Sequence, residues 1–319
     1  MRMNLKTQGL ILTILILFSV TVTKLRVVPT LSITKADNVP VSITDSKPYN
    51  LSYRQASLVG VETPFEITHA PIRNWSVLDP KINAQAVLID SLDDNYPFLR
   101  YNTYKEWPLA SLTKLISSVV VFEDIGINKK VSVSQNAVDT EGNAGELRSG
   151  EVYTARDLLK IMLLRSSNDA AVAFEEYLGK DGFVKLMNDK AHELGMTSTK
   201  FYDASGLDDN NKGTASDMLR LAKYILESEP DILNWTRITQ TLVQPINDTT
   251  SRELLNINGL VSENNFFGGK TGTSDKARQN LLAIFSLDGK KIILIILGSE
   301  DRMADAKSLM AWVKSAYQF

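Results

Sequence analysis

Residues 280–297 read NLLAIFSLDGKKIILIIL and contain two apolar runs, 280–287 and 291–297, joined by Asp288-Gly289. An Asp-Gly pair between two apolar runs is a strong signal for a tight β-hairpin, because both residues tolerate the backbone of a two-residue turn. A helix is expected next, from about Met303 to Tyr317. The end of the chain therefore predicts two antiparallel strands followed by a helix.

The preceding part of the chain predicts strands first and helices second. Residues 84–90 form a short apolar run typical of a buried strand, and 98–103 is a strand that pairs with it. Thr154 and Thr214 are expected to cap helices, since each is followed three residues later by aspartate. Apolar residues at intervals of three and four predict helices over 111–124, 154–165, 168–178, 181–194 and 214–227. This order implies an α+β fold with an antiparallel sheet built from both chain ends, flanked by helices, and an inserted helical subdomain.

Composition excludes several classes of function. The chain has 319 residues, 44% hydrophobic and 23% charged, which is ordinary for a globular protein. Its formal net charge of -2 gives no basic excess, so no nucleic-acid partner is expected. Cysteine is absent, which removes thiol nucleophiles and thiolate metal sites, and neither a metal nor a cofactor is expected. The two histidines, His69 and His192, make a Ser-His-Asp hydrolase improbable.

The N-terminal region is expected to lie outside the main domain. Residues 7–23 carry no charge and are long enough for a short membrane span or a secretory signal. No Ala-x-Ala-like cleavage site follows, which favours an uncleaved anchor over residues 1–26. Residues 27–72 carry five prolines with little periodicity, as in an extended tether, and the catalytic domain is predicted to occupy 73–319.

The first of three short motifs is Ser111-Leu112-Thr113-Lys114 at the start of a predicted helix. Residues three apart on a helix share a face, so a neutral lysine amine can deprotonate the serine hydroxyl without a histidine. Backbone N–H groups at a helix N-terminus favour an oxyanion beside the serine. Ser-x-x-Lys is common by chance, and a second copy at Ser32–Lys35 lies in the predicted tether.

The other two motifs are Ser166-Ser167-Asn168, at the break between two predicted helices, and Lys270-Thr271-Gly272. Ser-x-Asn alone is weak, because Ser134–Asn136 and Ser262–Asn264 also match and any of them can be a helix cap. Lys-Thr-Gly occurs once, and its glycine suits a strand edge along which a substrate backbone lies. In this order, the three motifs form the signature of β-lactamases and penicillin-binding proteins.

On these motifs, the chain resembles the D-alanyl-D-alanine carboxypeptidases, which are low-molecular-mass penicillin-binding proteins of serine peptidase family S11. Segments 201–207 (FYDASGL) and 214–218 (TASDM) also resemble the family. Around the motifs, the similar segments are PLASLTKL at 108–115, LRSSNDA at 164–170, with serine where the family usually has glycine, and GKTGTSDKA at 269–277.

The resemblance implies a β-lactamase/transpeptidase-like fold and a role for each matched residue. Ser111 would be the nucleophile, Lys114 its general base, and Ser166 a proton relay toward the leaving amine. Asn168 would hold the substrate's peptide, Lys270 would be a cation in the cleft, and Thr271 would bind the terminal carboxylate. Gly272 would leave room for the substrate, and the N–H groups of Ser111 and Thr273 would form the oxyanion hole. A second cation close to Lys114 is expected to lower the pKa of that lysine, and Arg302 is a further candidate for binding the carboxylate.

The expected function is therefore removal of the terminal D-alanine from peptidoglycan stem peptides through an acyl-enzyme, with β-lactams as covalent inhibitors. Three different functions stay open at this point: a DD-endopeptidase, a class A-like β-lactamase and a non-catalytic penicillin-binding sensor. The β-lactamase needs a Glu-x-x-Leu-Asn loop, and Glu253-Leu254-Leu255-Asn256 is the nearest string but does not fit. The expected location is the cell membrane, with the catalytic domain outside the cytoplasm, or secretion if the first segment is cleaved.

Overall fold

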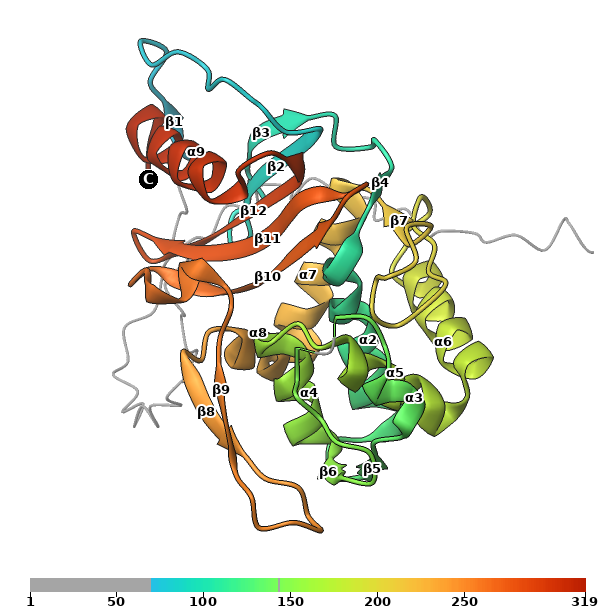
Figure 1. Cartoon of the computed structure of the whole chain (residues 1–319). Coiled ribbons are helices and arrows are strands. Elements are labelled where there is room, and N and C mark those ends of the chain that lie inside the picture. The colour runs from blue at the N-terminus through green and yellow to red at the C-terminus, as the bar shows by residue number, and fades with distance from the viewer. Residues whose placement is uncertain (1–69, 143) are drawn as a thin grey trace, which may run out of the picture. The chain divides into compact units, whose positions relative to one another are not determined.

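A computed structural model describes residues 70–142 and 144–319 of the chain. At its centre is a five-stranded antiparallel sheet in the order β10-β11-β12-β2-β3 (Figure 1). The strands are β2 Ala86–Ser91, β3 Pro97–Tyr101, β10 Phe266–Ser274, β11 Arg278–Leu287 and β12 Lys290–Ser299. The predicted hairpin is confirmed as β11 and β12, with positive φ at both Asp288 and Gly289.

The central sheet combines strands from the N-terminal and C-terminal parts of the described chain, as predicted. Strand β12 pairs with β2, so that Ile295 lies opposite Leu88, and β2 pairs with β3 on its other side. Strand β10 has a sheet neighbour on one side only, β11, which leaves its other edge open toward the helices.

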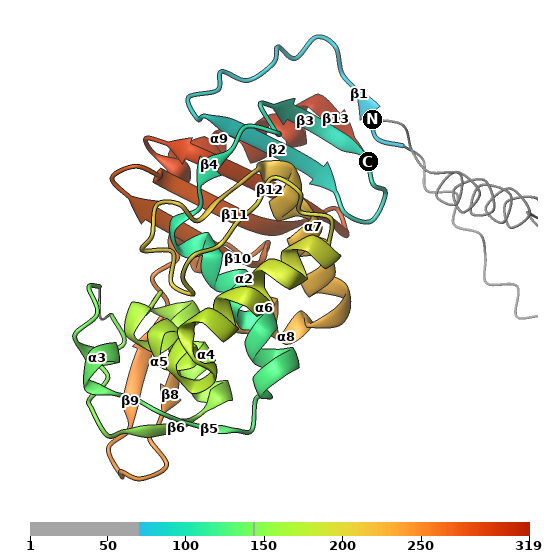
Figure 2. The same cartoon turned by 90° about the vertical axis from the view of Figure 1, so that its right-hand side faces the viewer.

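The long apolar runs arise because the sheet is covered on both faces. Along β2, Leu88 packs toward the helical subdomain, whereas its neighbours Val87 and Ile89 pack under the C-terminal helix α9, Arg302–Ala316. Strand β12 alternates in the same way, since successive side chains of a strand point to opposite faces. Figures 1 and 2 show α9 on one face of the sheet and the other helices on the opposite face.

The helical subdomain begins with a 3₁₀ turn, η1 Ala110–Thr113, that runs into α2 Lys114–Val120 and a π-helical turn, η2 Val121–Ile125. The Thr154 and Thr214 side chains accept hydrogen bonds from the Asp157 and Asp217 amides, which confirms both predicted caps. The remaining helices are α3 Gln135–Val138, α4 Ala155–Leu164, α5 Asn168–Leu178, α6 Lys180–Glu193, α7 Ala215–Ser228, α8 Pro230–Thr236 and the 3₁₀ turn η3 Gly259–Ser262.

Short strand pairs lie outside the central sheet. They are β1 Ile72–Arg73 with β13 Tyr317–Gln318, β4 Trp107–Pro108 with β7 Lys212–Gly213, β5 Lys130–Ser132 with β6 Val152–Thr154, and β8 Gln240–Val243 with β9 Arg252–Leu255. The pairing of β1 with β13 places the start of the predicted catalytic domain beside its C-terminus.

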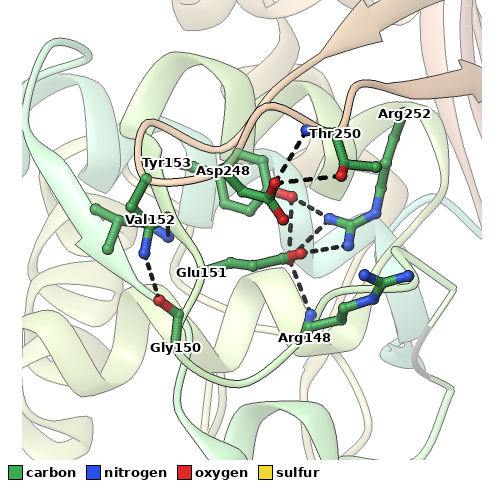
Figure 3. Close-up of polar contacts among 9 residues, drawn as sticks. Arg148, Gly150, Glu151, Val152, Tyr153, Asp248, Thr250 and Arg252 are labelled. Atoms are coloured by element: carbon green, nitrogen blue, oxygen red, sulfur yellow. Dashed lines mark hydrogen bonds and ion pairs between the residues drawn. The ribbon is translucent and has the colours of Figure 1, made fainter.

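A buried ion pair holds the β8–β9 hairpin to the loop before β6 (Figure 3). Arg252 on β9 donates from both terminal nitrogens to the Glu151 carboxylate, at 2.5 and 2.7 Å, and also to the Tyr153 hydroxyl. Burial raises the pKa of Glu151, but hydrogen bonds and charge from Arg252 more than offset this, so that the pKa is lowered overall. The pair therefore fixes the hairpin against the helical subdomain.

The predicted anchor, and nearly all of the predicted tether, lie outside the described residues. Within 70–142 and 144–319, no helix is both long and apolar enough to cross a membrane.

Candidate active site

The predicted nucleophile and base lie one turn apart. Ser111 is in the 3₁₀ turn η1, and Lys114 is the first residue of α2. Lys114 Nζ lies 3.1 Å from Ser111 Oγ, which is hydrogen-bond distance. The residue before the nucleophile, Ala110, has a φ of 47°, in the left-handed region, so the chain turns sharply into the helix at this point.

The Lys114 side chain is fully buried among polar partners. Its amine donates to Asn168 Oδ1 at 2.7 Å and to the Ser205 carbonyl at 2.5 Å. Burial lowers the pKa of Lys114 to about 7, although the charges of Asp203 and Asp169 act in the opposite direction. The expectation of a lowered pKa is met, but its main cause is burial and not the second cation.

The second motif lies at the junction of α4 and α5. Ser166 has a φ of 57°, and this left-handed residue turns the chain between the two helices. Ser167, where the family usually has glycine, caps α5 by accepting a hydrogen bond from the Ala170 amide, and donates to the Asp169 carboxylate. Asn168 begins α5, and its amide nitrogen donates to the Glu141 carbonyl at 2.8 Å, which fixes the side chain toward Lys114.

The third motif lies on β10, across from the second. Lys270 Nζ donates to Ser166 Oγ at 2.9 Å and to the Thr271 carbonyl at the same distance. Burial, together with the nearby charges of Lys114 and Arg302, holds the pKa of Lys270 well below its ordinary value. A bound carboxylate would raise that pKa again, so the cationic role of Lys270 stays a prediction about the occupied site.

Gly272 brings β10 against the nucleophile. A Cβ at this position would lie 2.8 Å from the Leu109 carbonyl oxygen and 3.1 Å from the Ser111 nitrogen, so no side chain fits. The neighbouring Thr273 is exposed, and its hydroxyl accepts a hydrogen bond of 2.6 Å from Arg302 at the start of α9. Thr271 is buried on the same strand. Arg302 therefore reaches the strand where a substrate carboxylate is expected.

Sequence reasoning missed the support beneath Lys114. The buried Asp203 carboxylate accepts hydrogen bonds from the amides of Ser205, Gly206 and Asp208 at 2.5 to 2.7 Å. These bonds fold the loop that presents the Ser205 carbonyl to Lys114. Gly206 is required in this loop, because a Cβ would lie 2.0 Å from the Ala110 carbonyl oxygen. The only signal in the sequence was the resemblance of residues 201–207 to the family.

The fold thus brings residues from three distant segments together in one site. Ser111, Lys114 and Asn168 share one set of hydrogen bonds, and Ser166 with Lys270 forms another at the open edge of β10. A serine within hydrogen-bond distance of a buried lysine amine, beside a strand edge that can pair with an extended peptide, has the groups that acyl transfer requires.

Comparison with known proteins agrees with this geometry. Residues 74–301 match the family model described as Peptidase_S11, D-alanyl-D-alanine carboxypeptidase. The chain belongs to the S11 peptidase family. It is 29% identical over 250 residues to D-alanyl-D-alanine carboxypeptidase DacF of Bacillus subtilis, covering 73% of this chain. It is 34% identical over 183 residues to a D-alanyl-D-alanine endopeptidase of Haemophilus influenzae, covering 56% of this chain.

The chain spans 62% of the length of each of these two relatives. Among solved structures, the crystal structure of a D-alanyl-D-alanine carboxypeptidase from Mycobacterium tuberculosis superposes with a TM-score of 0.70 at 25% identity. The superposition covers 76% of this chain and 96% of that one. The predicted β-lactamase/transpeptidase-like α+β fold is confirmed, since such neighbours share it.

Proposed function

We propose that this protein is a serine-type D-Ala-D-Ala carboxypeptidase that removes the terminal D-alanine of peptidoglycan stem peptides. The observation that carries the proposal is the buried amine of Lys114, 3.1 Å from Ser111 Oγ, with a pKa of about 7. A general base works best when its pKa lies near the working pH, because much of it is then unprotonated while it still accepts a proton readily.

In the proposed reaction, Ser111 Oγ attacks the carbonyl carbon of the penultimate D-alanine and passes its proton to Lys114 Nζ. The N–H groups of Ser111 and Thr273 stabilise the oxyanion that forms. The C–N bond then breaks, and the departing amine of the terminal D-alanine takes the proton that Lys114 gained, relayed through the Ser166 hydroxyl, which Lys270 Nζ holds at 2.9 Å. Lys114 is then neutral again. A water molecule, deprotonated in turn by Lys114, hydrolyses the ester and releases the shortened peptide.

Binding is assigned to the edge of β10. Asn168 retains an amide hydrogen for a peptide carbonyl, since only one of its two is given to Glu141. Lys270, Thr271 and Arg302 would bind the terminal carboxylate, and the absent side chain of Gly272 lets the substrate approach Ser111. A β-lactam would acylate the same serine, because its ring amide takes the place of the scissile bond.

The second candidate is a DD-endopeptidase, which would use the same residues on a cross-linked peptide. The 34% identity to a protein named D-alanyl-D-alanine endopeptidase favours it. A cross-linked dimer peptide separates the two activities, since the endopeptidase releases two stem peptides and the carboxypeptidase releases free D-alanine.

A class A-like β-lactamase and a penicillin-binding sensor have less support. Glu253, which the β-lactamase would need in a loop beside the acyl group, is an exposed residue on strand β9. A non-catalytic sensor would acylate without turnover, although every side chain of the proposed mechanism is in place.

We also propose that the protein works at the cell membrane. Residues 1–26 would be a single span, or a cleaved signal in a secreted form, 27–72 a tether, and 73–319 the catalytic domain outside the cytoplasm. Support for this comes from the uncharged segment 7–23 and from the location of the proposed substrate.

The test treats the full-length chain in detergent with a fluorescent penicillin and, separately, with diacetyl-L-Lys-D-Ala-D-Ala. Ser111→Ala removes the nucleophile, and Ser76→Ala, an exposed serine away from the cleft, is the matched control. We expect penicillin labelling and D-alanine release from the wild type and from Ser76→Ala, and neither from Ser111→Ala. Labelling without release from this peptide would favour the endopeptidase or the sensor, and no labelling of folded protein would refute the proposal.

A further inference from the structure

A polar recess of about 370 Å³ lies near the C-terminal end of β10. It is lined by Trp107 and Pro108, by Asp209 and Lys276, and by three further polar residues, Glu106, Asn210 and Lys212. Pro108 precedes the nucleophile by three residues, and Asp209 contacts Ser274, which directly follows Thr273. The recess therefore begins one strand residue beyond the proposed oxyanion hole.

The proposed function fixes which part of a substrate would reach this recess, and the inference rests on it. With the terminal carboxylate at Thr271 and the scissile carbonyl at Thr273, the peptide runs antiparallel to β10. The residue before the two D-alanines then lies about 3.3 Å further along, opposite Ser274. Its side chain can extend toward the loop that carries Asp209.

Asp209 and Lys276 present opposite charges side by side at this point. The Asp209 carboxylate lies 3.2 Å from Lys276 Nζ and accepts a hydrogen bond of 3.2 Å from Ser274 Oγ. The side chains remain 32% and 74% exposed, respectively, so a ligand can approach both. An exchange of partners is feasible, because an exposed ion pair contributes little to stability.

The loop that carries Asp209 is held firmly relative to the nucleophile. The amide of the neighbouring Asp208 is bonded to the buried Asp203 carboxylate at 2.5 Å. Asn211, which is fully buried, donates to the Asp203 carbonyl at 3.1 Å and to Thr113 Oγ1 at 3.3 Å, and Thr113 belongs to the 3₁₀ turn of Ser111.

The opposite wall of the recess is fixed in a similar way. Trp107 Nε1 donates to the Ala277 carbonyl at 2.9 Å, and the Ala277 amide donates to Ser274 Oγ at 3.1 Å. Asp209 and Lys276 are therefore carried by ordered segments, as recognition of one side chain requires.

We propose that this recess is a specificity subsite for the third residue of the stem peptide, and that it selects a long side chain ending in an ammonium beside a carboxylate. The ammonium binds Asp209 and the carboxylate binds Lys276. A lone ammonium would displace Lys276 from Asp209 and leave that lysine without a partner. The zwitterionic end group of a diaminodicarboxylic acid satisfies both charges, and is therefore preferred.

The experiment compares three peptides that end in D-Ala-D-Ala and differ only in the third residue. That residue is diaminopimelate with a free zwitterionic end, L-lysine with a free amine, or Nε-acetyl-lysine. The enzymes are the full-length wild type, Asp209→Asn, Lys276→Met, and Asp189→Asn as a control that breaks an exposed Lys–Asp pair on α6. The readouts are kcat/KM for D-alanine release and competition against fluorescent penicillin.

For the wild type and for Asp189→Asn, we expect kcat/KM for the zwitterionic peptide to exceed that for the acetylated peptide by about tenfold. Each partly exposed ion pair should raise kcat/KM roughly three- to fivefold. Asp209→Asn should reduce this ratio to about three- to fivefold, because the pair between the substrate carboxylate and Lys276 remains. Lys276→Met should remove the advantage of the zwitterionic peptide over the lysine peptide.

Equal kcat/KM values for the three peptides in the wild type would overturn the inference. An equal loss on all three peptides in Asp209→Asn would also overturn it, because that residue would then act only on the structure of the loop. Failure of the proposed function looks different, since no peptide would release D-alanine. The competition assay would still rank the three peptides in that case, and the ranking alone would support or overturn the subsite.

Discussion

The pH dependence of acylation follows from the environment of Lys114. Because only the neutral amine can take the proton of Ser111, the acylation rate should follow the fraction of Lys114 that is unprotonated. Burial lowers the pKa of this amine from 10.5 to about 7. An exposed lysine would be neutral in only about one molecule in 3,000 at pH 7, whereas Lys114 is neutral in about half.

The size of the effect follows from the same pKa. Below pH 7 the acylation rate should fall about tenfold for each pH unit, to roughly a tenth of its maximum at pH 6 and a hundredth at pH 5. Above about pH 8 the rate should be constant. Asp169→Asn supplies an independent check, because it removes a negative charge that holds the pKa of Lys114 up, so the acid limb should move to lower pH.

The assay is stopped-flow acylation by a fluorescent penicillin under single-turnover conditions from pH 5 to pH 9. Circular dichroism at each pH excludes unfolding as the cause of a lost rate. A rate that stays constant between pH 5 and pH 9 would refute the assignment of Lys114 as the base. A limb that moves to higher pH in Asp169→Asn would contradict the electrostatic argument.

Two further predictions concern stability. Gly206→Ala should destabilise the fold by more than the roughly 1–2 kcal/mol that a positive φ costs, and should slow acylation, because its Cβ would clash with Ala110. The control is Gly126→Ala, which has a similar φ of +89° but no atom within 4 Å of the added Cβ. Both variants are compared with the wild type by thermal unfolding and penicillin labelling. Arg252→Met should cost about 3–5 kcal/mol at pH 7 by leaving Glu151 buried without its partner, and Glu151→Gln with Arg252→Met should cost less than Arg252→Met alone. The folded-state pKa of Glu151 lies below the unfolded value. The ion pair therefore stabilises the folded state fully above about pH 4.5, and this contribution is lost as the pH falls through the folded-state pKa. An equal loss of unfolding free energy in Arg252→Met at pH 7 and at pH 3 would contradict this account.

The elements that the sequence predicted are those with a local signal. Helix α5 begins at Asn168 and ends at Leu178, as expected, and the Thr154 cap and the Asp288-Gly289 turn were readable from neighbouring residues alone. Period and capping act over a few residues, so they survive without any knowledge of tertiary structure.

Contacts between distant residues could not be predicted in this way. Lys114 and the Ser205 carbonyl are 91 positions apart, and Arg252 lies 101 positions from Glu151. The two-residue strands β4 and β7 exist only because the folded chain brings them together, and they have no periodicity of their own. The roles of the three motifs were inferred from resemblance, whereas the cause of the lowered pKa of Lys114 depended on burial that only the fold defines.

The measurement that tests the central claim most directly is capture of the acyl-enzyme formed from a D-Ala-D-Ala peptide. The full-length chain is mixed with the peptide, quenched in acid within milliseconds to seconds, digested, and examined by mass spectrometry. The account predicts an added mass equal to the peptide minus D-alanine, attached to the fragment that contains Ser111 and absent in Ser111→Ala. D-alanine release with the added mass on another residue, or release by Ser111→Ala at the wild-type rate, would contradict it.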